Sequence, residues 1–304
     1  MAEQGKYIPF FGCMILGKYP QFEAAVRLTM ERLGVELVDI EGFTCCPDPI
    51  FYKSHDKLKW LTIAARNLCL AEARGLDLVT CCSGCTATFA ETVHYLGHDE
   101  GLKREVNKRL KKIGMQYEGT STVRHIVTVV RDDVGLDAVA ASVTRPLEGM
   151  RVGIHYGCHL LKPSNVMQVD DPDRPEILEN LVRAIGAQAI EHHEKVLCCG
   201  KACMDDQIPA RMLLDILLSV EKLGVHCLGL ICPTCFDEYD LGQIRLARLF
   251  DKKFDIPIIY YFQLLGLAQG FAPEELGLQF HKIKAKGMLA ELNLNGNETK
   301  VSAR

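Results

Sequence analysis

The sequence lacks the features of membrane-spanning, secreted and nucleic-acid-binding proteins. Its longest apolar stretch, IPIIYYFQLLGLAQGF, is interrupted by Pro257, Gln263 and Gln269 and is too short to span a bilayer. The first residues, MAEQGKYIPFFGC, are neither basic enough nor apolar enough for a secretory signal. The formal net charge of −4 gives no sign of nucleic acid or an anionic membrane as a partner. We therefore expect a soluble, cytoplasmic protein with no membrane span.

Cysteine, in contrast, is abundant. The chain has 14 cysteines in 304 residues, a length sufficient for two domains. Disulfides would be expected in a small secreted chain, but this chain is neither small nor signalled for export. Because the cysteines also cluster along the sequence, they are more typical of metal ligands or redox centres.

The cysteines of the first half follow short apolar runs. KYIPFFGC ends at Cys13, VELVDIEGFTCC at Cys46 and LDLVTCCSGC at Cys85. Each run is rich in β-branched or aromatic residues and predicts a buried strand, and helical patterns lie between them at 20–34 and 57–75. Alternating strands and helices predict a parallel sheet, in which ligands gather beyond the carboxyl ends of the strands.

The second half repeats this arrangement. RVGIHYGC, AIEHHEKVLCC and VHCLGLICPTC end at equivalent cysteines, with helical segments at 175–186 and 207–223. Equivalent cysteines are 145 to 153 residues apart, which indicates a duplicated domain. We predict an α/β fold of two pseudo-symmetric repeats, each a small parallel sheet with flanking helices and cysteines at the carboxyl ends of its strands. The expected bounds are 1–147 and 148–291, followed by a polar, flexible tail at 292–304.

Each half carries five cysteines in the same order: a single cysteine, a vicinal pair and a CxxC. A disulfide between neighbouring cysteines would be strained, so the vicinal pairs need another explanation. A CxxC alone is a weak signal, but this order at strand ends in both halves indicates a metal or cluster site in each. The first set is Cys13, Cys45, Cys46, Cys82 and Cys85, and the second is Cys158, Cys198, Cys199, Cys232 and Cys235.

Five thiolates are one more than the usual tetrahedral or cubane site requires. A structural zinc ion takes four ligands, and a cubane 4Fe–4S cluster takes four thiolates. Neighbouring cysteines could instead bridge two metal ions or serve two irons of a cluster that is not a cube. Soft thiolates select iron–sulfur, zinc or copper(I), so zinc on four of the five cysteines stays open at this point.

With two copies of this cysteine order, the chain resembles the family of B subunits of CoB–CoM heterodisulfide reductase, which are built from two cysteine-rich CCG domains. The resemblance covers nearly the whole chain except its tail. It implies a noncubane 4Fe–4S cluster in each half, made of two fused smaller units and held by all five cysteines of the motif. The ten cysteines match that motif one for one. The implied reaction reduces the mixed disulfide of coenzyme M and coenzyme B to two thiols. Because a disulfide takes two electrons, our hypothesis is that each cluster delivers one electron and binds one sulfur.

The same resemblance implies partner subunits. Many relatives with CCG domains carry a ferredoxin module on the same chain, with cysteines spaced CxxCxxCxxxC, and this run is absent here. Electrons are therefore expected from the ferredoxin-like C subunit and the flavin-containing A subunit of heterodisulfide reductase, with a hydrogenase or formate dehydrogenase further upstream. A stand-alone CCG electron-transfer protein of a lactate- or glycolate-type oxidoreductase remains the alternative.

Four cysteines lie outside the two sets. Cys69 and Cys227 fall within helical or apolar patterns and are interpreted as core thiols, since free cysteine packs as a small hydrophobe. Cys81 aligns with Ile231 of the second half and is not assigned as a ligand. Cys203 completes CCGKAC but has no counterpart in the first half, so its role stays open.

Histidines and lysines near the cysteine motifs are candidates for other roles. His159 follows Cys158 directly and is the candidate proton donor to a leaving thiolate. His155 is expected to be structural, and His192 and His193 to lie on the surface. The substrate implied by the resemblance carries a sulfonate and a phosphate, which basic side chains bind well. The candidates are Lys162, Lys201 and Lys53, which lie near the cysteine motifs in sequence.

Overall fold

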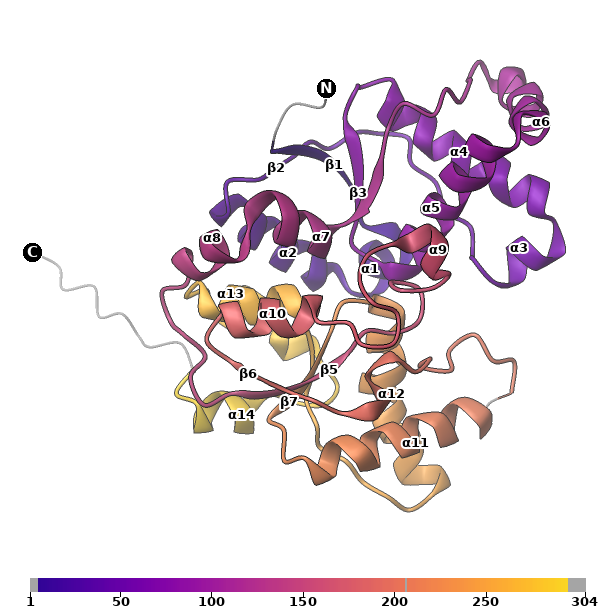
Figure 1. The fold of residues 1–304 in the computed structure, drawn as a ribbon. Helices are drawn as coiled ribbons and strands as arrows, with labels where there is room; N and C mark the ends of the chain where they lie inside the picture. Colours follow the sequence, from indigo (N-terminus) through magenta and orange to yellow (C-terminus); the bar gives the residue numbers. More distant parts are fainter. Residues whose placement is uncertain (1–4, 206, 295–304) are drawn as a thin grey trace, which may run out of the picture.

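The first half is a four-stranded parallel sheet flanked by helices (Figure 1). The computed structural model describes residues 5–205 and 207–294. The strand order is β2-β1-β3-β4, with β1 at Lys6–Phe10, β2 at Glu36–Leu37, β3 at Asp77–Thr80 and β4 at Val123–His125. The helices are α1 (Gly12–Lys18), α2 (Pro20–Arg32), α3 (Phe51–His55), α4 (Lys57–Glu72), α5 (Ser83–His98), α6 (Glu100–Leu110), α7 (Ile126–Val129) and α8 (Leu136–Ala141), with a short 3-10 helix at Lys111–Ile113 and a π-helix at Val130–Val134.

The second half repeats this sheet, in the order β6-β5-β7-β8 and again all parallel. Its strands are β5 (Arg151–His155), β6 (Gln188–Ile190), β7 (Cys227–Leu230) and β8 (Ile258–Tyr260). Its helices are α9 (Ser164–Met167), α10 (Ile177–Ala184), α11 (Gln207–Lys222), α12 (Pro233–Leu249), α13 (Tyr261–Ala268) and α14 (Lys286–Glu291), with 3-10 helices at His193–Val196 and Leu278–Phe280. The predicted fold class is thus confirmed.

Two details of the sheets differ from the sequence prediction. Each sheet has a fourth strand, β4 or β8, that was not predicted. The strand expected to run up to Cys45 ends already at Leu37, because β2 is an edge strand that pairs with β1 over only two residues. Beyond it, Glu41 and Gly42 are exposed, and Gly42 has a φ of +95° that bends the chain out of the sheet. The vicinal cysteines therefore lie on a loop.

Local sequence signals explain where the main helices begin and end. Pro20 occupies the first position of α2, where its missing N–H is not needed. Gly34 follows that helix with a φ of +73°, a conformation that only glycine adopts without strain. The carboxylate of Asp56 caps α4 by accepting a hydrogen bond of 2.9 Å from the backbone N–H of Lys59.

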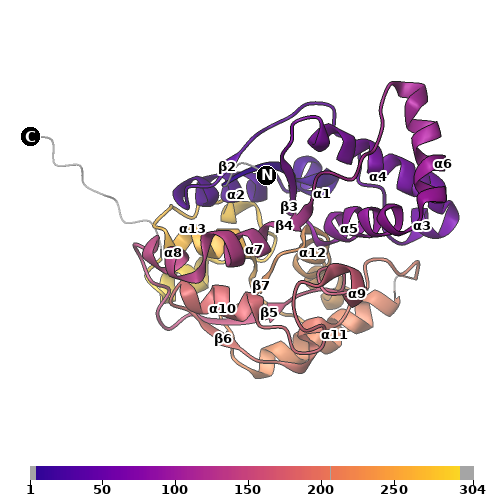
Figure 2. The ribbon, with the colours of Figure 1, turned by 45° about the horizontal axis from the view of Figure 1, so that its top comes forward.

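The two halves pack together through helices α2 and α13 (Figures 1 and 2). Phe22 of α2 is fully buried, and its ring stacks on Tyr260 with centroids 4.5 Å apart. Phe22 and Tyr19 also make edge contacts with Phe236 of α12, at 4.7 Å and 4.9 Å between centroids. Such pairs bury large apolar surfaces and prefer these geometries. This aromatic cluster fixes how the two sheets face each other.

A second crossing runs from the second half to the first. The segment after Cys158 reaches over to place α9 against α5, as Figure 2 shows. Just after α9, the carbonyl oxygen of Val169 accepts a hydrogen bond of 2.7 Å from the guanidinium of Arg131, which belongs to the first half. The residues that follow Cys158 are thereby held between the halves.

No helix within the described ranges is long and apolar enough to cross a membrane. At the carboxyl end, Leu294 is buried, and its backbone N–H donates a hydrogen bond of 2.7 Å to the carbonyl of Leu289. Residues 295–304, which make up most of the predicted tail, lie outside the described residues. The predicted bounds of the two repeats and of the tail stay predictions.

Candidate metal centre

The ten predicted ligand cysteines all lie on segments that follow the carboxyl ends of strands. Cys13 lies in the first turn of α1, after β1, and Cys158 lies in the turn after β5. The vicinal pairs lie on the loops after the edge strands β2 and β6. Cys82 and Cys232 are the N-cap residues of α5 and α12, so the positive ends of two long helices face these sulfurs. A helix amino terminus favours a thiolate, the form that binds metals.

The sulfurs of the ten cysteines form one unbroken chain of neighbours. Within the first set, the thiol of Cys85 lies 3.2 Å from that of Cys46. Within the second, Cys158 and Cys198 are 3.9 Å apart. Neighbouring thiols are close enough to shift one another's pKa in the order Cys13, Cys45, Cys46, Cys85, Cys82, Cys232, Cys235, Cys199, Cys198 and Cys158. The order on one side of the Cys82–Cys232 contact mirrors the order on the other, so the two sets meet at the interface between the halves.

Crowding of the thiols changes their acidity. Hydrogen bonds from Cys45 and then Cys85 lower the pKa of Cys46 to about 5. The pKa of Cys232 is also lowered, because Cys235 and Cys82 both donate to its sulfur. The pKa of Cys198 is lowered as well, whereas the pKa values of the other seven cysteines of the two sets are raised, so three of the ten favour the thiolate form. All 14 cysteines are free of disulfides.

Two glycines leave room for the sulfurs. Gly12 and Gly157 precede the first cysteine of each set and have φ values of +75° and +70°. A Cβ atom on Gly12 would lie 2.8 Å from the sulfur of Cys85, and one on Gly157 would lie 3.0 Å from that of Cys235. Glycine is therefore favoured at both positions for two reasons. Its backbone adopts a positive φ without strain, and it has no Cβ atom to clash with the nearby sulfur.

Each cysteine set lines its own cavity. The first five cysteines surround a cavity of about 200 Å³ and the second five surround one of about 170 Å³. Each is several times the roughly 30 Å³ that one water molecule occupies in the liquid. The cavities adjoin, because Asp48, Pro49, Gly84 and Thr234 contribute to the walls of both.

The way the cysteines line the two cavities indicates which kind of metal centre they could hold. Within residues 5–205 and 207–294, no three cysteine, histidine or carboxylate side chains converge on one point as the ligands of a single ion would. The thiols are instead spread around two walls. Soft sulfur donors around a cavity are consistent with iron–sulfur clusters, which contain several metal atoms.

Buried polar residues hold the loops that carry the vicinal pairs. In the first half, the side chain of Asn67 accepts a hydrogen bond of 2.9 Å from the backbone of Thr44 and donates one of 3.1 Å to the carbonyl of Cys45. In the second half, the buried ammonium of Lys195 pairs with the buried carboxylate of Glu179 at 2.7 Å. A buried pair of this kind fixes its loop strongly, because removal of either partner leaves an uncompensated charge.

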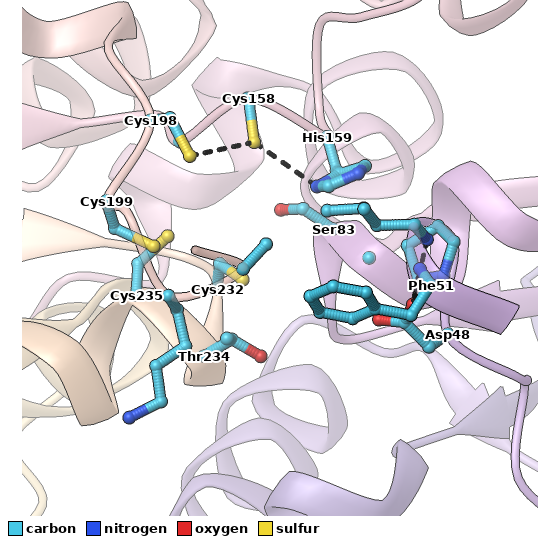
Figure 3. A pocket seen from close by; sticks show the side chains of 16 residues that line it. Asp48, Phe51, Ser83, Cys158, His159, Cys198, Cys199, Cys232, Thr234 and Cys235 are labelled. Atoms are coloured by element: carbon cyan, nitrogen blue, oxygen red, sulfur yellow. Dashed lines mark hydrogen bonds between the residues drawn. The ribbon is translucent and has the colours of Figure 1, made fainter. Parts of the chain in front are cut away.

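Figure 3 shows the second cavity, where residues of both halves meet. The cysteines of the second set form one side, and Asp48, Phe51 and Ser83 of the first half form the other. The imidazole Nδ1 of His159 lies 3.2 Å from the sulfur of Cys158 and also faces this cavity. The structure thus places the predicted proton donor beside a predicted ligand.

Comparison with known proteins supports this interpretation of the cysteines. Residues 7–90 and 152–238 each match the cysteine-rich domain known as CCG. The chain is 37% identical to the B subunit of the ferredoxin/F420H2-dependent CoB–CoM heterodisulfide reductase of Methanosarcina acetivorans, over 93% of this chain and 95% of that protein. It is 33% identical to a protein of Archaeoglobus profundus described as like the B subunit of heterodisulfide reductase, over 89% of this chain and 93% of that one.

The chain belongs to the family of heterodisulfide reductase B subunits. Proteins with other functions share the architecture, since the chain is also 30% identical to the membrane anchor subunit of the 8-methylmenaquinol:fumarate reductase of Wolinella succinogenes, over 93% of this chain and 98% of that protein. A hypothetical protein from Helicobacter pylori has a similar fold, with a TM-score of 0.70 and 18% identity over 93% of this chain and 52% of that one. At this identity the likeness concerns the fold alone.

In this member of the heterodisulfide reductase family, the three lysines predicted for substrate binding differ in whether they lie at the cysteine cavities. Lys201 lines the second cavity, but its ammonium is 2.8 Å from the carboxylate of Asp237 and 3.3 Å from that of Glu238. Lys53 pairs with Glu91, and neither residue lines either cysteine cavity. Lys162 is exposed and also lies outside both linings. Of the three, only Lys201 is at the site.

The three histidines outside the predicted site differ in how far the structure matches their predicted burial. His155 is fully buried, and burial lowers its pKa to about 3, as suits a structural histidine. His192 was expected on the surface, which is wrong. It is 4% exposed, and its Nε2 lies 2.6 Å from the carbonyl oxygen of Ile154, because the chain turns inward after β6 to reach the buried Lys195. His193 is exposed as expected.

Sequence reasoning missed several residues of the site. Ser83 and Thr234 lie inside the two CxxC motifs, and Phe51 reaches the second cavity from the opposite half. Gly12 and Gly157 could have been found, because FFGC and HYGC place a glycine before the first cysteine in both halves. The contribution of Phe51 could not, since it depends on how the halves pack. Cys69, Cys81 and Cys227 are buried, and Cys203 is exposed.

Proposed function

We propose that this protein is the catalytic iron–sulfur subunit that reduces the CoM–CoB heterodisulfide to its two thiols. The observation that supports this most directly is the pair of adjoining cavities, each lined by five cysteines, where the two halves meet. When bound, two noncubane 4Fe–4S clusters would each supply one electron for the disulfide, and iron would bind the two sulfurs released. The ten cysteines of the two sets would hold them.

The protein's own residues bind the substrate and handle protons. The Nδ1 atom of His159 lies 3.2 Å from the sulfur of Cys158 and faces the second cavity, where a protonated imidazole could give a proton to a thiolate. Lys201 also lines this cavity, and its pairing with Asp237 and Glu238 offsets its charge. Phe51 of the first half also lines the cavity, with 48% of its surface exposed.

The first cysteine set is the accessible one. Cys13 and Cys45 are exposed, whereas Cys158 and Cys198 are half-buried. The sequence contains no CxxCxxCxxxC run of its own. We therefore place the chain in a cytoplasmic complex with the ferredoxin-like C subunit and the flavin-containing A subunit of heterodisulfide reductase, supplied by a hydrogenase or formate dehydrogenase. A stable, fully active monomer reduced directly by a flavoprotein would contradict this assignment.

Two measurements test the function. Iron and acid-labile sulfide should amount to about eight of each per chain if each half holds a four-iron cluster, with zinc absent from the same sample. The isolated chain, oxygen-free and supplied with reduced methyl viologen, should cleave the heterodisulfide. Colourless protein with about two zinc ions per chain would show instead that the cysteines form a structural scaffold.

A second function is favoured by one comparison. The fumarate reductase protein matches this chain over nearly its full length, and 26% identity also links the chain to a lactate utilization protein A of Bacillus pumilus, over 81% of this chain and 94% of that protein. The clusters would then relay electrons for chemistry on another subunit, as in lactate- or glycolate-type oxidoreductases. A relay would accept electrons from methyl viologen and hold iron, yet leave the heterodisulfide intact.

A further inference from the structure

The two cysteine sets differ in the hydrogen-bond donors around them. In the second set, the backbone N–H of Gly200 donates a hydrogen bond of 3.3 Å to the sulfur of Cys198. The equivalent residue of the first set, two positions after Cys45, is Pro47, which has no N–H. Beside the first cysteine of each set, the second half has His159 and the first half has Met14. Proline thus removes a backbone donor from the first set, and methionine offers no side-chain donor where the second set has an imidazole.

A further donor reaches the second cavity from the other half of the protein. Ser83 lies within the CxxC of the first half, yet its side chain lines the second cavity, and Figure 3 shows the hydroxyl directed into it. The residue is 1% exposed, and its Oγ atom has no hydrogen-bond partner among the described residues. The equivalent position in the second half is Pro233, which has no hydroxyl.

An unpaired buried hydroxyl is costly, so its retention in the wall of a cavity needs an explanation. The carbonyl of Cys82 next to it is already engaged, since it accepts a hydrogen bond of 2.9 Å from the backbone N–H of Thr86 in the helix that begins at Ser83. The second cavity is lined by five sulfurs. A sulfur acceptor inside that cavity would complete the hydrogen bonding of the hydroxyl.

We propose that Ser83 donates a hydrogen bond to a sulfur of the metal group in the second cavity and thereby raises the reduction potential of that group. The proposal rests on the proposed iron–sulfur function. A donor stabilises the reduced form, which carries more negative charge, and hydrogen bonds to sulfur are among the known determinants of cluster potentials. One half of the protein thus tunes the redox centre of the other and favours electron transfer toward it.

Other contributions to the potential do not replace that of Ser83. Thr234 lies in the walls of both cavities, so it does not distinguish them. Cys13 and Cys45 are exposed, and water near them raises the reduction potential of the metal group in the first cavity. This effect reduces the difference in potential that Ser83 creates between the two metal groups. For this reason the shift caused by changing Ser83, rather than the order of the two potentials, is the decisive quantity.

The test compares redox titrations of oxygen-free holoprotein, followed by electron paramagnetic resonance, for the parent, Ser83→Ala and Ser83→Thr. Ser83→Ala should lower the potential of one of the two groups and leave the other unchanged, and Ser83→Thr, which keeps the hydroxyl, should restore the parent value. The matched control is Ser121→Ala. Ser121 is also buried in the first half, but its hydroxyl already donates a hydrogen bond of 3.0 Å to the carbonyl of Leu76.

The outcomes separate this proposal from the proposed function. If Ser83→Ala retains the parent's iron content but both potentials are unchanged, the hydroxyl does not reach a sulfur and the proposal is wrong, while the iron–sulfur function stands. A shift of both potentials, or an equal shift in Ser121→Ala, would also overturn it, since the effect would then be global. Parent protein without iron would overturn the function itself, and this inference with it.

Discussion

The hydroxyl of Tyr260 donates a hydrogen bond of 2.8 Å to the carbonyl oxygen of Cys81. Tyr260 ends β8 of the second half, and Cys81 follows β3 of the first. The bond therefore ties the ends of two strands from different sheets, directly beside the point where Cys82 and Cys232 meet. Because the bond is fully buried, it helps to keep the two cysteine sets in contact.

Tyr260→Phe is expected to reduce the free energy of unfolding by about 1 to 2 kcal/mol, because the buried carbonyl of Cys81 loses its donor. The ring and its stacking on Phe22 are retained. Urea denaturation of the parent and the variant measures the change. Tyr261→Phe is the matched control. Tyr261 is the next residue in the chain, and its hydroxyl makes only a long hydrogen bond of 3.4 Å, to the carbonyl of Leu181. Equal losses in the two variants would show that the contact between halves has no special weight.

Gly12→Ala and Gly157→Ala are expected to impair metal assembly in their own half. The new methyl group would lie 2.8 Å or 3.0 Å from a cysteine sulfur, closer than an ordinary van der Waals contact. Purified Gly12→Ala should contain about half of the parent's iron if each half binds its group independently.

The control for these variants is Gly34→Ala. Gly34 has nearly the same φ, +73°, but a Cβ there would have no atom within 4 Å. Alanine in this left-handed conformation costs roughly 1 to 2 kcal/mol of stability wherever it occurs. Gly34→Ala should therefore be less stable yet keep its full iron content. Iron loss in this control as well would mean that backbone strain alone, without the clash, disturbs the metal sites.

The arrangement of the two cysteine sets was largely predictable from the sequence. The order of single cysteine, pair and CxxC is local, and the short apolar runs before Cys13 and Cys158 placed them after strands. The loop to Cys45 was harder, because an edge strand ends where its pairing ends, and VELVDI alone does not reveal that β2 pairs over only two residues.

Contacts between the halves could not be predicted in this way. The fourth strand β8 is hidden in an apolar run that continues directly into α13, and periodicity does not separate a short buried strand from a buried helix. Ser83 and Phe51 join the second cavity only because the two halves pack together. The role predicted for Lys201 stays a prediction, and its carboxylate partners on α12 depend on tertiary structure that the sequence did not show.

The protein should lose stability in mild acid because of His281. This histidine is fully buried, and burial together with the charge of Lys284 lowers its pKa to about 4, although a backbone hydrogen bond at Ile258 acts in the opposite direction. In the unfolded chain, histidine binds a proton below about pH 6.5. Since the unfolded state then binds more protons, stability falls as pH drops from about 6.5 toward 4.

For this histidine the loss should reach about 2 kcal/mol at pH 5 relative to pH 7. The measurement compares urea denaturation at both pH values for the parent and His281→Gln. Because acid lability of the metal sites affects both proteins, only the difference between their pH profiles counts. A variant as acid-sensitive as the parent would show that His281 is not the group that titrates.

The two-site mechanism is tested by Cys46→Ser and Cys199→Ser. Each removes one member of a vicinal pair, in the first and second half respectively, and the serine oxygen is a harder ligand that suits a soft metal site poorly. If each half supplies one electron and captures one sulfur, both variants should lose cleavage of the heterodisulfide at least a hundredfold, even though the other half keeps its iron. Cys69→Ser is the control, since this buried thiol lies outside both cavities and should keep its iron and its rate.

Iron content and circular dichroism must accompany the rates, because metal binding is coupled to folding and loss of one group could loosen the domain. The contact between Cys82 and Cys232 makes the result informative, since the two sets adjoin and a disulfide could reach both cavities. A folded Cys46→Ser protein that has lost the iron of its own half, yet turns over near the parent's rate, would remove the first half from the chemistry. The second cavity, with His159 and Ser83 in its walls, would then be the whole reaction site.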